Sequence, residues 1–298
     1  MRFGVPLGLV HPDGWHDLAV AADELGFDSV WLPEHLVLAT GAGMRGYPGG
    51  RAPIRPSTPL YDAPVRLAAL AAATRAVRLG TAVYLLGLRH PLASARAFAT
   101  LDGIAGGRTV LGVGAGWYRA EWDAVGAPFE ARGRRLDEAI GVLRRLWSEE
   151  AVAHDGPHFP FPEVAFEPKP PRRAIPILIG GESPAALRRA ARNDGWISMP
   201  APPERVAVAA AELRRLRAEA GRAAAPFEVV AHAEGGCRPD ETAAWAAAGV
   251  HTLVVRPWKR GRDALAAIER FARDHALAPR GPSDAAVPLG RTVGGRGR

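Results

Sequence analysis

The chain has 298 residues, of which 48% are hydrophobic, and it contains 34 glycines and 27 prolines. This composition is typical of a globular α/β protein with many turns. The length allows one large domain or two small ones, and a (β/α)8 barrel needs about 250 residues. No apolar run of about 18 residues occurs, so we expect no membrane span. Cys237 is the only cysteine, which excludes an intrachain disulfide and a cysteine metal cluster. We therefore expect a cytoplasmic protein whose first residues form a strand rather than a signal peptide.

The basic charge does not indicate nucleic-acid binding. The formal net charge is +7, and residues 277–298 carry four arginines and one aspartate. This stretch is rich in glycine and proline, so we expect a flexible basic C-terminal tail after a single domain at 1–276. The other basic residues alternate with acids on helix faces, without a basic stripe and interleaved aromatic residues. His154 and His158 have no matching set of ligands, and we expect no metal site.

Apolar strand-like segments alternate with segments of helical periodicity along the chain. The first half predicts strands at 2–8, 28–32, 77–85 and 108–114, and helices at 14–25, 60–74, 91–104 and 134–147. An irregular insertion follows at 149–174. The second half predicts strands at 175–179, 196–199, 227–233 and 252–255, and helices at 184–193, 203–220, 240–248 and 261–275. Eight such units predict a closed parallel barrel rather than an open sheet, because each strand is apolar enough for burial on both faces.

In a barrel of this kind, chemistry belongs at the carboxyl ends of the strands. Polar and glycine residues follow four of the expected strands. They are Glu34 and His35 after the second strand, Arg89 and His90 after the third, Gly114, Gly116 and Trp117 after the fourth, and Gly180, Gly181, Glu182 and Ser183 after the fifth. These residues form the candidate site.

The turn at residues 180–183 has the features of a phosphate site. Gly180 and Gly181 allow a tight turn and close approach of a ligand to the backbone. Ser183 is a good N-cap and Pro184 suits the first helical position. The free N–H groups and the dipole of such a helix start attract phosphate. An ordinary capped turn between a strand and a helix explains the spacing equally well.

Six motifs occur in order over residues 1–275. They are ADELGFDSVW at 22–31 with Glu34-His35, LGTAV at 79–83, RHP at 89–91, LDGIAGGR at 101–108, GVGAGW at 112–117, and the turn at 180–183. Together they resemble the bacterial luciferase-like monooxygenase superfamily, and most of all its branch that uses the deazaflavin coenzyme F420. The resemblance implies an α/β fold, a (β/α)8 TIM barrel with an insertion after the fourth helix, and a homodimer.

The resemblance also implies where a cofactor binds. The phosphate of a flavin or deazaflavin would lie at the turn formed by Gly180, Gly181, Glu182 and Ser183. A non-prolyl cis peptide between Ala82 and Val83 would support the ring, with Thr81 before it. Gly114, Gly116 and Trp117 would complete the cofactor-binding set. Coenzyme F420 is the expected cofactor, and FMN is the alternative.

His35 and Glu34 are the candidate catalytic residues. The family places a histidine near the ring and substrate, where His35 could stabilise an oxyanion or deliver a proton. Glu34 could orient His35 or act as the acid itself. Trp117 is a departure, since related sugar-phosphate and alcohol dehydrogenases carry a catalytic glutamate at that position. A tryptophan is no general acid, so Trp117 is interpreted as an apolar wall, a stacking surface for substrate, or core packing.

These observations lead to three hypotheses. The first is an F420-dependent oxidoreductase that transfers hydride between the deazaflavin and a small organic substrate, with reduction of a C=C, C=N or C=O bond as the expected direction. The second is an FMN-dependent monooxygenase of the same superfamily. The third is a non-catalytic flavin-binding barrel. Three arginines of the long loop, Arg45, Arg51 and Arg55, could steer the polyglutamate tail of F420, or could simply be solvated.

Overall fold

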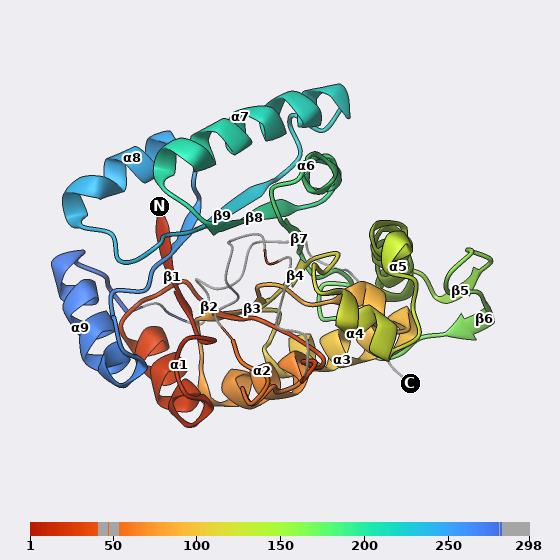
Figure 1. Ribbon diagram of the computed structural model, residues 1–298, viewed down its shortest axis with the longest axis horizontal. Coiled ribbons are helices and arrows are strands. Elements are labelled where there is room, and N and C mark those ends of the chain that lie inside the picture. The colour runs from red at the N-terminus through yellow and green to blue at the C-terminus, as the bar shows by residue number, and fades with distance from the viewer. Residues whose placement is uncertain (41–46, 48–53, 280, 282–298) are drawn as a thin grey trace, which may run out of the picture.

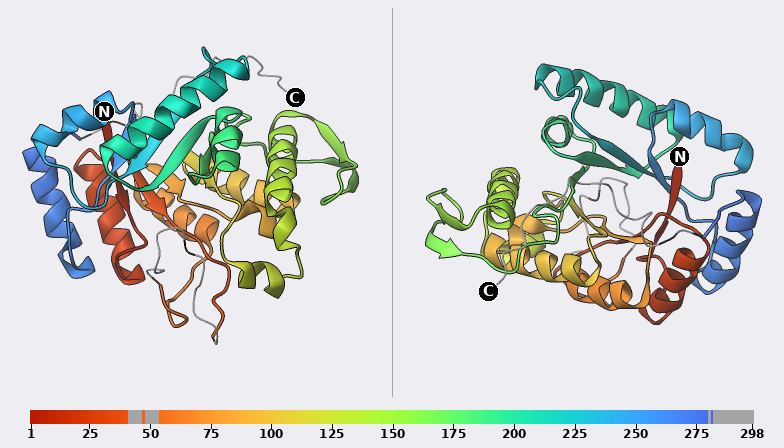
Figure 2. Two further views of the ribbon diagram at one scale, coloured as in Figure 1. Left: turned by 45° about the horizontal axis from the view of Figure 1, so that its top comes forward. Right: turned by 180° about the vertical axis from the view of Figure 1, so that it is seen from behind.

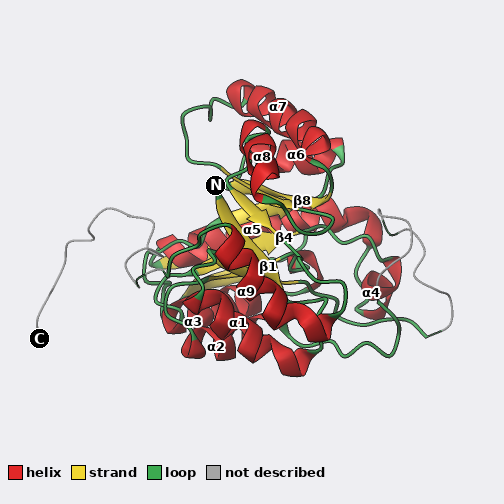
Figure 3. Ribbon diagram, turned by 90° about the vertical axis from the view of Figure 1, so that its left-hand side faces the viewer, coloured by secondary structure: helices red, strands yellow, loops and turns green. Residues whose placement is uncertain are grey.

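The computed structural model describes residues 1–40, 47, 54–279 and 281. Eight parallel strands close into a barrel, as predicted, in the order β1-β10-β9-β8-β7-β4-β3-β2. They are β1 (Arg2–Pro6), β2 (Ser29–Leu32), β3 (Arg78–Thr81), β4 (Thr109–Val113), β7 (Ile177–Gly180), β8 (Gly195–Pro200), β9 (Glu228–His232) and β10 (Thr252–Val254). The helices surround this barrel (Figures 1 and 3).

The helices of the described residues occur where the alternating pattern predicts them, with one addition. They are α1 (Trp15–Glu24), α2 (Ala63–Ala73), α3 (Pro91–Ile104), α4 (Arg119–Ala124), α5 (Arg132–Ser148), α6 (Pro184–Ala191), α7 (Pro203–Glu219), α8 (Thr242–Ala247) and α9 (Ala264–Asp274). Short 3-10 turns occur at Pro12–Gly14, Leu86–Leu88, Phe129–Ala131, Pro239–Glu241 and Gly261–Asp263. The short helix α4 is not among the predicted elements.

The insertion at 149–174 is more regular than expected. It contains an antiparallel hairpin of β5 (Ala151–His154) and β6 (Phe161–Ala165). The hairpin projects from the barrel beside α5 (Figures 1 and 2). Glu138 of α5 fixes its turn, because the carboxylate accepts hydrogen bonds from the backbone N–H groups of His158 and Phe159 at 3.1 and 2.9 Å. His154 Nε2 lies 3.1 Å from the same oxygen, so this histidine serves the hairpin.

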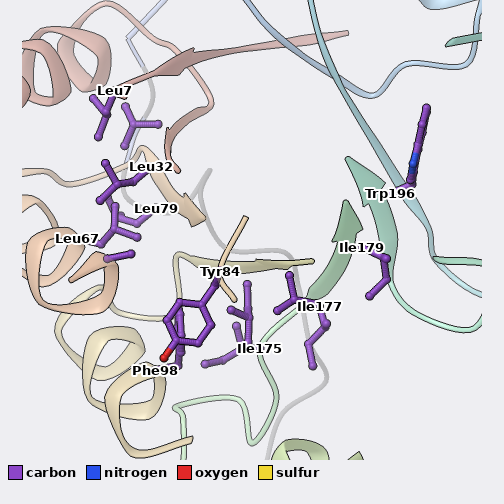
Figure 4. Packing of buried hydrophobic residues seen from close by; sticks show 14 of the residues in the cluster. Leu7, Leu32, Leu67, Leu79, Tyr84, Phe98, Ile175, Ile177, Ile179 and Trp196 are labelled. Carbon is purple, nitrogen blue, oxygen red and sulfur yellow. The ribbon is translucent and has the colours of Figure 1, made fainter. Parts of the chain in front are cut away.

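Two apolar layers hold the barrel together. The larger one lies between the strands and the surrounding helices, and Figure 4 shows part of it, including Leu32, Leu79, Phe98 and Ile177. The smaller one fills the barrel and consists of Trp31, Val110, Leu178, Ile197, Val230 and Val254, with Ala82 and Val83 against it. Burial of such side chains contributes about 1.5–3 kcal/mol each to folding.

Glycines make room for Trp31, which belongs to the apolar layer inside the barrel. A Cβ at Gly80 would lie 2.4 Å from the Trp31 ring, and one at Gly4 would lie 2.9 Å from its indole nitrogen. The indole N–H donates to Ser29 Oγ at 2.9 Å. Trp31 therefore closes the lower part of the barrel, and any ligand space lies above it, toward the carboxyl ends of the strands.

The amino ends of the strands carry a buried ionic cluster. Arg78 donates to Asp28 Oδ2 at 2.5 and 3.0 Å and to both carboxylate oxygens of Glu228 at 2.7 and 2.9 Å. Arg2 also donates to Glu228, at 2.7 Å. These ion pairs lower the pKa of Glu228 to about 2 against the effect of burial. Because the cluster lies at the end of the barrel away from the candidate site, it serves stability.

The domain boundary at 276 stays a prediction. Helix α9 ends at Asp274, and most of the expected tail at 277–298 lies outside the described residues. Ala278, which is described, packs on the turn after α1, where a Cβ at Gly26 would lie 2.0 Å from its carbonyl oxygen. Among the helices of the described residues, none combines the length and apolarity needed to cross a bilayer.

Candidate functional site

The cis peptide expected between Ala82 and Val83 is confirmed. It directly follows β3 and places Val83 over the interior of the barrel, against the smaller apolar layer. A Cβ at Gly114 would lie 2.6 Å from Val83 Cγ2, and one at Gly180 would lie 2.6 Å from Val83 Cγ1. The Val83 side chain therefore lies between Gly114 and Gly180 and occupies the space that a side chain at either glycine would need. Val83, Gly114 and Gly180 together form the glycine cradle. Its surface at the barrel mouth is apolar.

Thr81 lies below this cradle and does not reach the mouth with its side chain. It is fully buried, and its hydroxyl donates to the carbonyl of Gly112 at 2.7 Å. This bond joins β3 to β4 where their ladder ends. Gly116, on the loop after β4, has φ +78°, a left-handed conformation that favours glycine.

The turn after β7 has the geometry expected of a phosphate site. Ser183 is the N-cap of α6, and its hydroxyl accepts from the N–H of Ala186 at 3.2 Å. Gly181 has φ +107°, and its carbonyl accepts from the indole of Trp196 at 2.8 Å. Within the described part of the chain, the N–H groups of Glu182 and Ser183 have no hydrogen-bond acceptor. Such N–H groups at a helix start can bind an anion.

The carboxylate of Glu182 is the feature of this turn that opposes anion binding. Arg205 of α7 compensates, because its guanidinium lies 2.6 Å from the Glu182 carboxylate. The Arg205 side chain is mostly exposed, so the ion pair itself contributes about 0–1 kcal/mol to stability. Arg205 therefore balances the charge of Glu182.

His35 is held by a carboxylate that the sequence did not reveal. Its Nδ1 lies 2.9 Å from Oε2 of Glu121 in α4, and the other oxygen of Glu121 accepts from the N–H of Leu36 at 2.5 Å. Glu121 is 1% exposed. An ionised carboxylate can only accept, so Nδ1 carries the hydrogen and Nε2 of His35 is left for a ligand.

The prediction that Glu34 orients His35 is wrong, since Glu121 has that position. The Glu34 carboxylate instead accepts from the N–H of Leu85 at 2.8 Å and from the guanidinium of Arg89 at 2.8 and 3.1 Å. Burial raises the pKa of Glu34, and Arg89 opposes this effect. Arg89 also lies over the ring of Tyr84, 4.7 Å from its centre. The pair therefore ties the loop after β2 to the loop after β3.

Aromatic rings border His35. The Trp117 ring is 5.7 Å from the His35 ring, edge to face, and 5.2 Å from the rings of Tyr47 and Tyr118. Tyr118 is buried, and its hydroxyl accepts from the N–H of Ala39 at 3.1 Å. Trp117 is partly exposed and packs against these three rings. Arg45 and Arg51 lie outside the described residues, and Arg55 is described and exposed.

The remaining polar candidate, His90, is structural. Its Nδ1 accepts from the N–H of Leu92 at 3.3 Å and so caps α3. Its ring also packs on Phe159 of the insertion. Among the described residues, no group of three or more His, Cys, Asp or Glu side chains is arranged to hold a metal ion.

The carboxyl end of this (β/α)8 barrel thus holds a glycine cradle, a helix-start turn with two free N–H groups and an oriented histidine, and in such barrels the active site lies at this end. The chain belongs to the luciferase-like monooxygenase family, whose family model matches residues 7–291. An uncharacterized protein from Mycobacterium tuberculosis is 32% identical over 231 residues, which are 77% of this chain and 80% of that protein.

Two further comparisons concern proteins with named activities. The F420-dependent glucose-6-phosphate dehydrogenase of Kineococcus radiotolerans is 37% identical over 186 residues, but the match covers 61% of this chain and only 50% of that enzyme. The structure of monooxygenase RslO1 from Streptomyces bottropensis has 25% identity and a TM-score of 0.72, and covers 92% of this chain and 98% of that one. Both relatives are named as oxidoreductases, the first as F420-dependent and the second as a monooxygenase.

The fold is shared with an F420-dependent secondary alcohol dehydrogenase, at 18% identity. The TM-score is 0.76, and the alignment covers 94% of this chain and 99% of that one. At this level of identity the likeness concerns the fold alone. The predicted barrel and the predicted family are thus both confirmed.

Proposed function

We propose that this protein is an F420-dependent oxidoreductase that reduces a C=C, C=N or C=O bond of a small organic substrate. The observation that carries the proposal is His35, fixed at Nδ1 by Glu121 and open at Nε2, at the end of the barrel that also holds the cradle and the turn at residues 180–183. When bound, the deazaflavin supplies two-electron hydride chemistry.

The residues of the site fit a phosphate-bearing tricyclic cofactor. The unpaired N–H groups of Glu182 and Ser183 suit the phosphate, and Arg205 offsets the charge of the Glu182 carboxylate. The apolar surface of Val83 suits contact with a flat ring, and the flanking residues Gly114 and Gly180 add no side chains around it. These fits support the cofactor class and serve FMN as well as F420.

His35 would deliver the proton that accompanies hydride addition. Because Nδ1 already directs its hydrogen to Glu121, the ring first takes up a second proton from water at Nε2, and the imidazolium then gives that proton to the substrate. A C=O bond that gains a hydride at carbon needs a proton at oxygen, and the substrate then leaves as an alcohol. Glu121 would act as a positioning residue, because it fixes the tautomer and the direction of the ring. Glu34 would support the loop through Arg89 rather than donate the proton, since both its oxygens already accept hydrogen bonds.

Related sugar-phosphate dehydrogenases use an acidic side chain at the position of Trp117 to oxidise their substrate. Because this chain has a tryptophan there, the residue supports reduction of the substrate instead. The indole has no proton to give at neutral pH, and its surroundings are the rings of His35, Tyr47 and Tyr118. The wall beside His35 is therefore aromatic, which suits an apolar or planar substrate.

An FMN-dependent monooxygenase is the second candidate, favoured by the likeness to RslO1 over 92% of the chain. Titration of the purified protein with F420 and with FMN, each followed by absorbance and fluorescence, decides between the two. An anaerobic substrate screen with the reduced cofactor follows. Tight F420 binding with anaerobic turnover is the expected result, whereas turnover that needs oxygen and FMN supports the second candidate. Failure to bind either cofactor would leave a non-catalytic barrel.

Two features of the assembled protein are also proposals. A homodimer and a cytoplasmic location are expected from the resemblance and from cysteine usage. Sedimentation velocity of the purified protein tests the first, and fractionation of the producing cells tests the second.

A further inference from the structure

A second histidine faces the interior of the barrel at the same end as His35. His232 is the last residue of β9, and it is paired in register with Val254 of β10. Val254 and Val230 both belong to the apolar layer inside the barrel. Side chains alternate along a strand, so His232 lies on the same face of β9 as Val230 and one layer nearer the mouth.

Hydrogen bonds fix the orientation of this ring. His232 Nδ1 lies 3.1 Å from the carbonyl oxygen of Ser198, and the His232 backbone N–H donates to Ser198 Oγ at 3.0 Å. A carbonyl oxygen can only accept, so Nδ1 carries the hydrogen. In the neutral ring, Nε2 is then a hydrogen-bond acceptor. No donor to Nε2 is found among the residues that the structure describes.

The charge state of His232 follows from its surroundings. Burial lowers its pKa to about 4, and the hydrogen bond with Ser198 only partly opposes this. The imidazole is therefore uncharged at neutral pH. The His232 side chain is only partly buried, and Nε2 is not among the buried polar atoms that lack a partner, so this neutral acceptor is accessible to a ligand donor.

We propose that His232 Nε2 accepts a hydrogen bond from an N–H or O–H group of the bound flavin or deazaflavin. This proposal rests on the proposed function. Both cofactors carry such donors, namely the imide N–H at the polar edge of the ring and the hydroxyls of the ribityl chain. His232 would thus be a binding residue on β9, two strands from the phosphate turn that follows β7.

Substitution of His232 by asparagine or by glutamine tests the roles of the two ring nitrogens separately. In His232→Asn the shorter side chain places its amide near the position of Nδ1, so it keeps a donor to Ser198 and loses the acceptor at Nε2. In His232→Gln the longer side chain keeps an acceptor near Nε2. His232→Leu removes both groups. The dissociation constants of F420 and FMN are measured by fluorescence titration, and urea unfolding of each cofactor-free variant reports folding.

We expect His232→Asn and His232→Leu to bind the preferred cofactor about tenfold more weakly than the wild type, and His232→Gln within about threefold of it. Titration with lumiflavin, which has the ring and no ribityl chain, then separates the two donors. A loss that persists with lumiflavin assigns the imide N–H, and a loss that disappears assigns a chain hydroxyl.

Other results overturn the proposal. If all three folded variants bind as tightly as the wild type, His232 makes no contact with the cofactor, although the proposed function stands. If His232→Gln loses as much affinity as His232→Asn, no acceptor at Nε2 is used. If the wild type binds neither cofactor, both the inference and the proposed function fail.

Discussion

The cradle predicts a specific energetic coupling between residues 83 and 180. An alanine Cβ at position 180 would lie 2.6 Å from Val83 Cγ1, whereas carbon atoms in contact are usually about 3.5–4.0 Å apart. Gly180 does not have a positive φ, so the cost of Gly180→Ala arises from this overlap and not from backbone strain. Overpacking of this kind costs about 1–3 kcal/mol of unfolding free energy.

Removal of the overlapping methyl group should relieve that cost. In Val83→Ala the nearest remaining atom of residue 83 is its Cβ, 3.7 Å from the new Cβ at 180, which is an ordinary contact. Val83→Ala alone loses about 1–1.5 kcal/mol, because its two methyl groups are only partly buried. The double variant should then be no less stable than Val83→Ala, which corresponds to a favourable coupling of about 1–3 kcal/mol.

Urea denaturation of the four proteins measures this coupling, from midpoints compared at constant m-value. Gly141→Ala on the exposed side of α5 is the matched control, since a Cβ there meets nothing within 4 Å. It should be more stable than the wild type by about 0.5–1 kcal/mol. Additive effects within about 0.5 kcal/mol at positions 83 and 180 would refute the reasoning.

Three further changes test the site and the barrel. Glu121→Gln should lower kcat by about tenfold or more, because the amide no longer serves both His35 Nδ1 and the Leu36 N–H as an acceptor. Cofactor affinity should stay unchanged. If the variant and the wild type have equal kcat values, Glu121 does not position His35. Arg205→Gln should weaken the binding of FMN by about threefold or more and leave the binding of riboflavin, which lacks the phosphate, unchanged. Equal losses of affinity for FMN and riboflavin would contradict a phosphate contact. Glu228→Gln should destabilise the protein by about 3 kcal/mol at pH 7, because the buried Arg78 guanidinium keeps its charge and loses a partner. Since the pKa of Glu228 is lowered on folding to about 2, its contribution is full above about pH 4.5 and is lost as the pH falls toward 2; unfolding followed against pH should show that loss in the wild type and not in the variant.

Much of the fold could be predicted because the local signals are strong. Helix α3 spans Pro91–Ile104 as expected, since a capping histidine and a proline mark its first turn. The strand expected at 77–85 is shorter, because the chain leaves the ladder after Thr81 at the cis peptide and then forms a 3-10 turn at Leu86–Leu88. Apolar periodicity cannot distinguish an apolar strand from the apolar loop that continues it.

The missed elements have weak local signals. Helix α4 has six residues between Tyr118 and Val125, too few to show a helical stripe. The hairpin formed by β5 and β6 contains prolines and exposed residues, which are typical of a loop. Its turn is fixed by Glu138 from α5, a contact that depends on the tertiary fold.

The same limit applies to the site. The residues next to glycines and capping signals were found from the sequence, and the turn at 180–183 is the best case. Glu121 was not found, because it lies 86 positions from His35 and only the packing of α4 brings them together. The sequence signal for Glu121 is only that this glutamate follows shortly after Gly114 and Gly116. His232 was not found either, since a lone histidine in an apolar strand is usually a buried packing residue.

The two histidines and the apolar layer below them together restrict what can occupy the mouth. β1 and β10 separate β2, which leads to His35, from β9, which carries His232. Both rings are held at Nδ1 and offer Nε2, the first beside aromatic rings and the second beside Ser198. Below this level the barrel is filled by the apolar layer that includes Trp31, and Val83 packs against that layer. Under the proposed function, a flavin or deazaflavin ring would suit this arrangement, because its polar edges could meet the two histidines while its apolar faces avoid leaving polar groups unpaired.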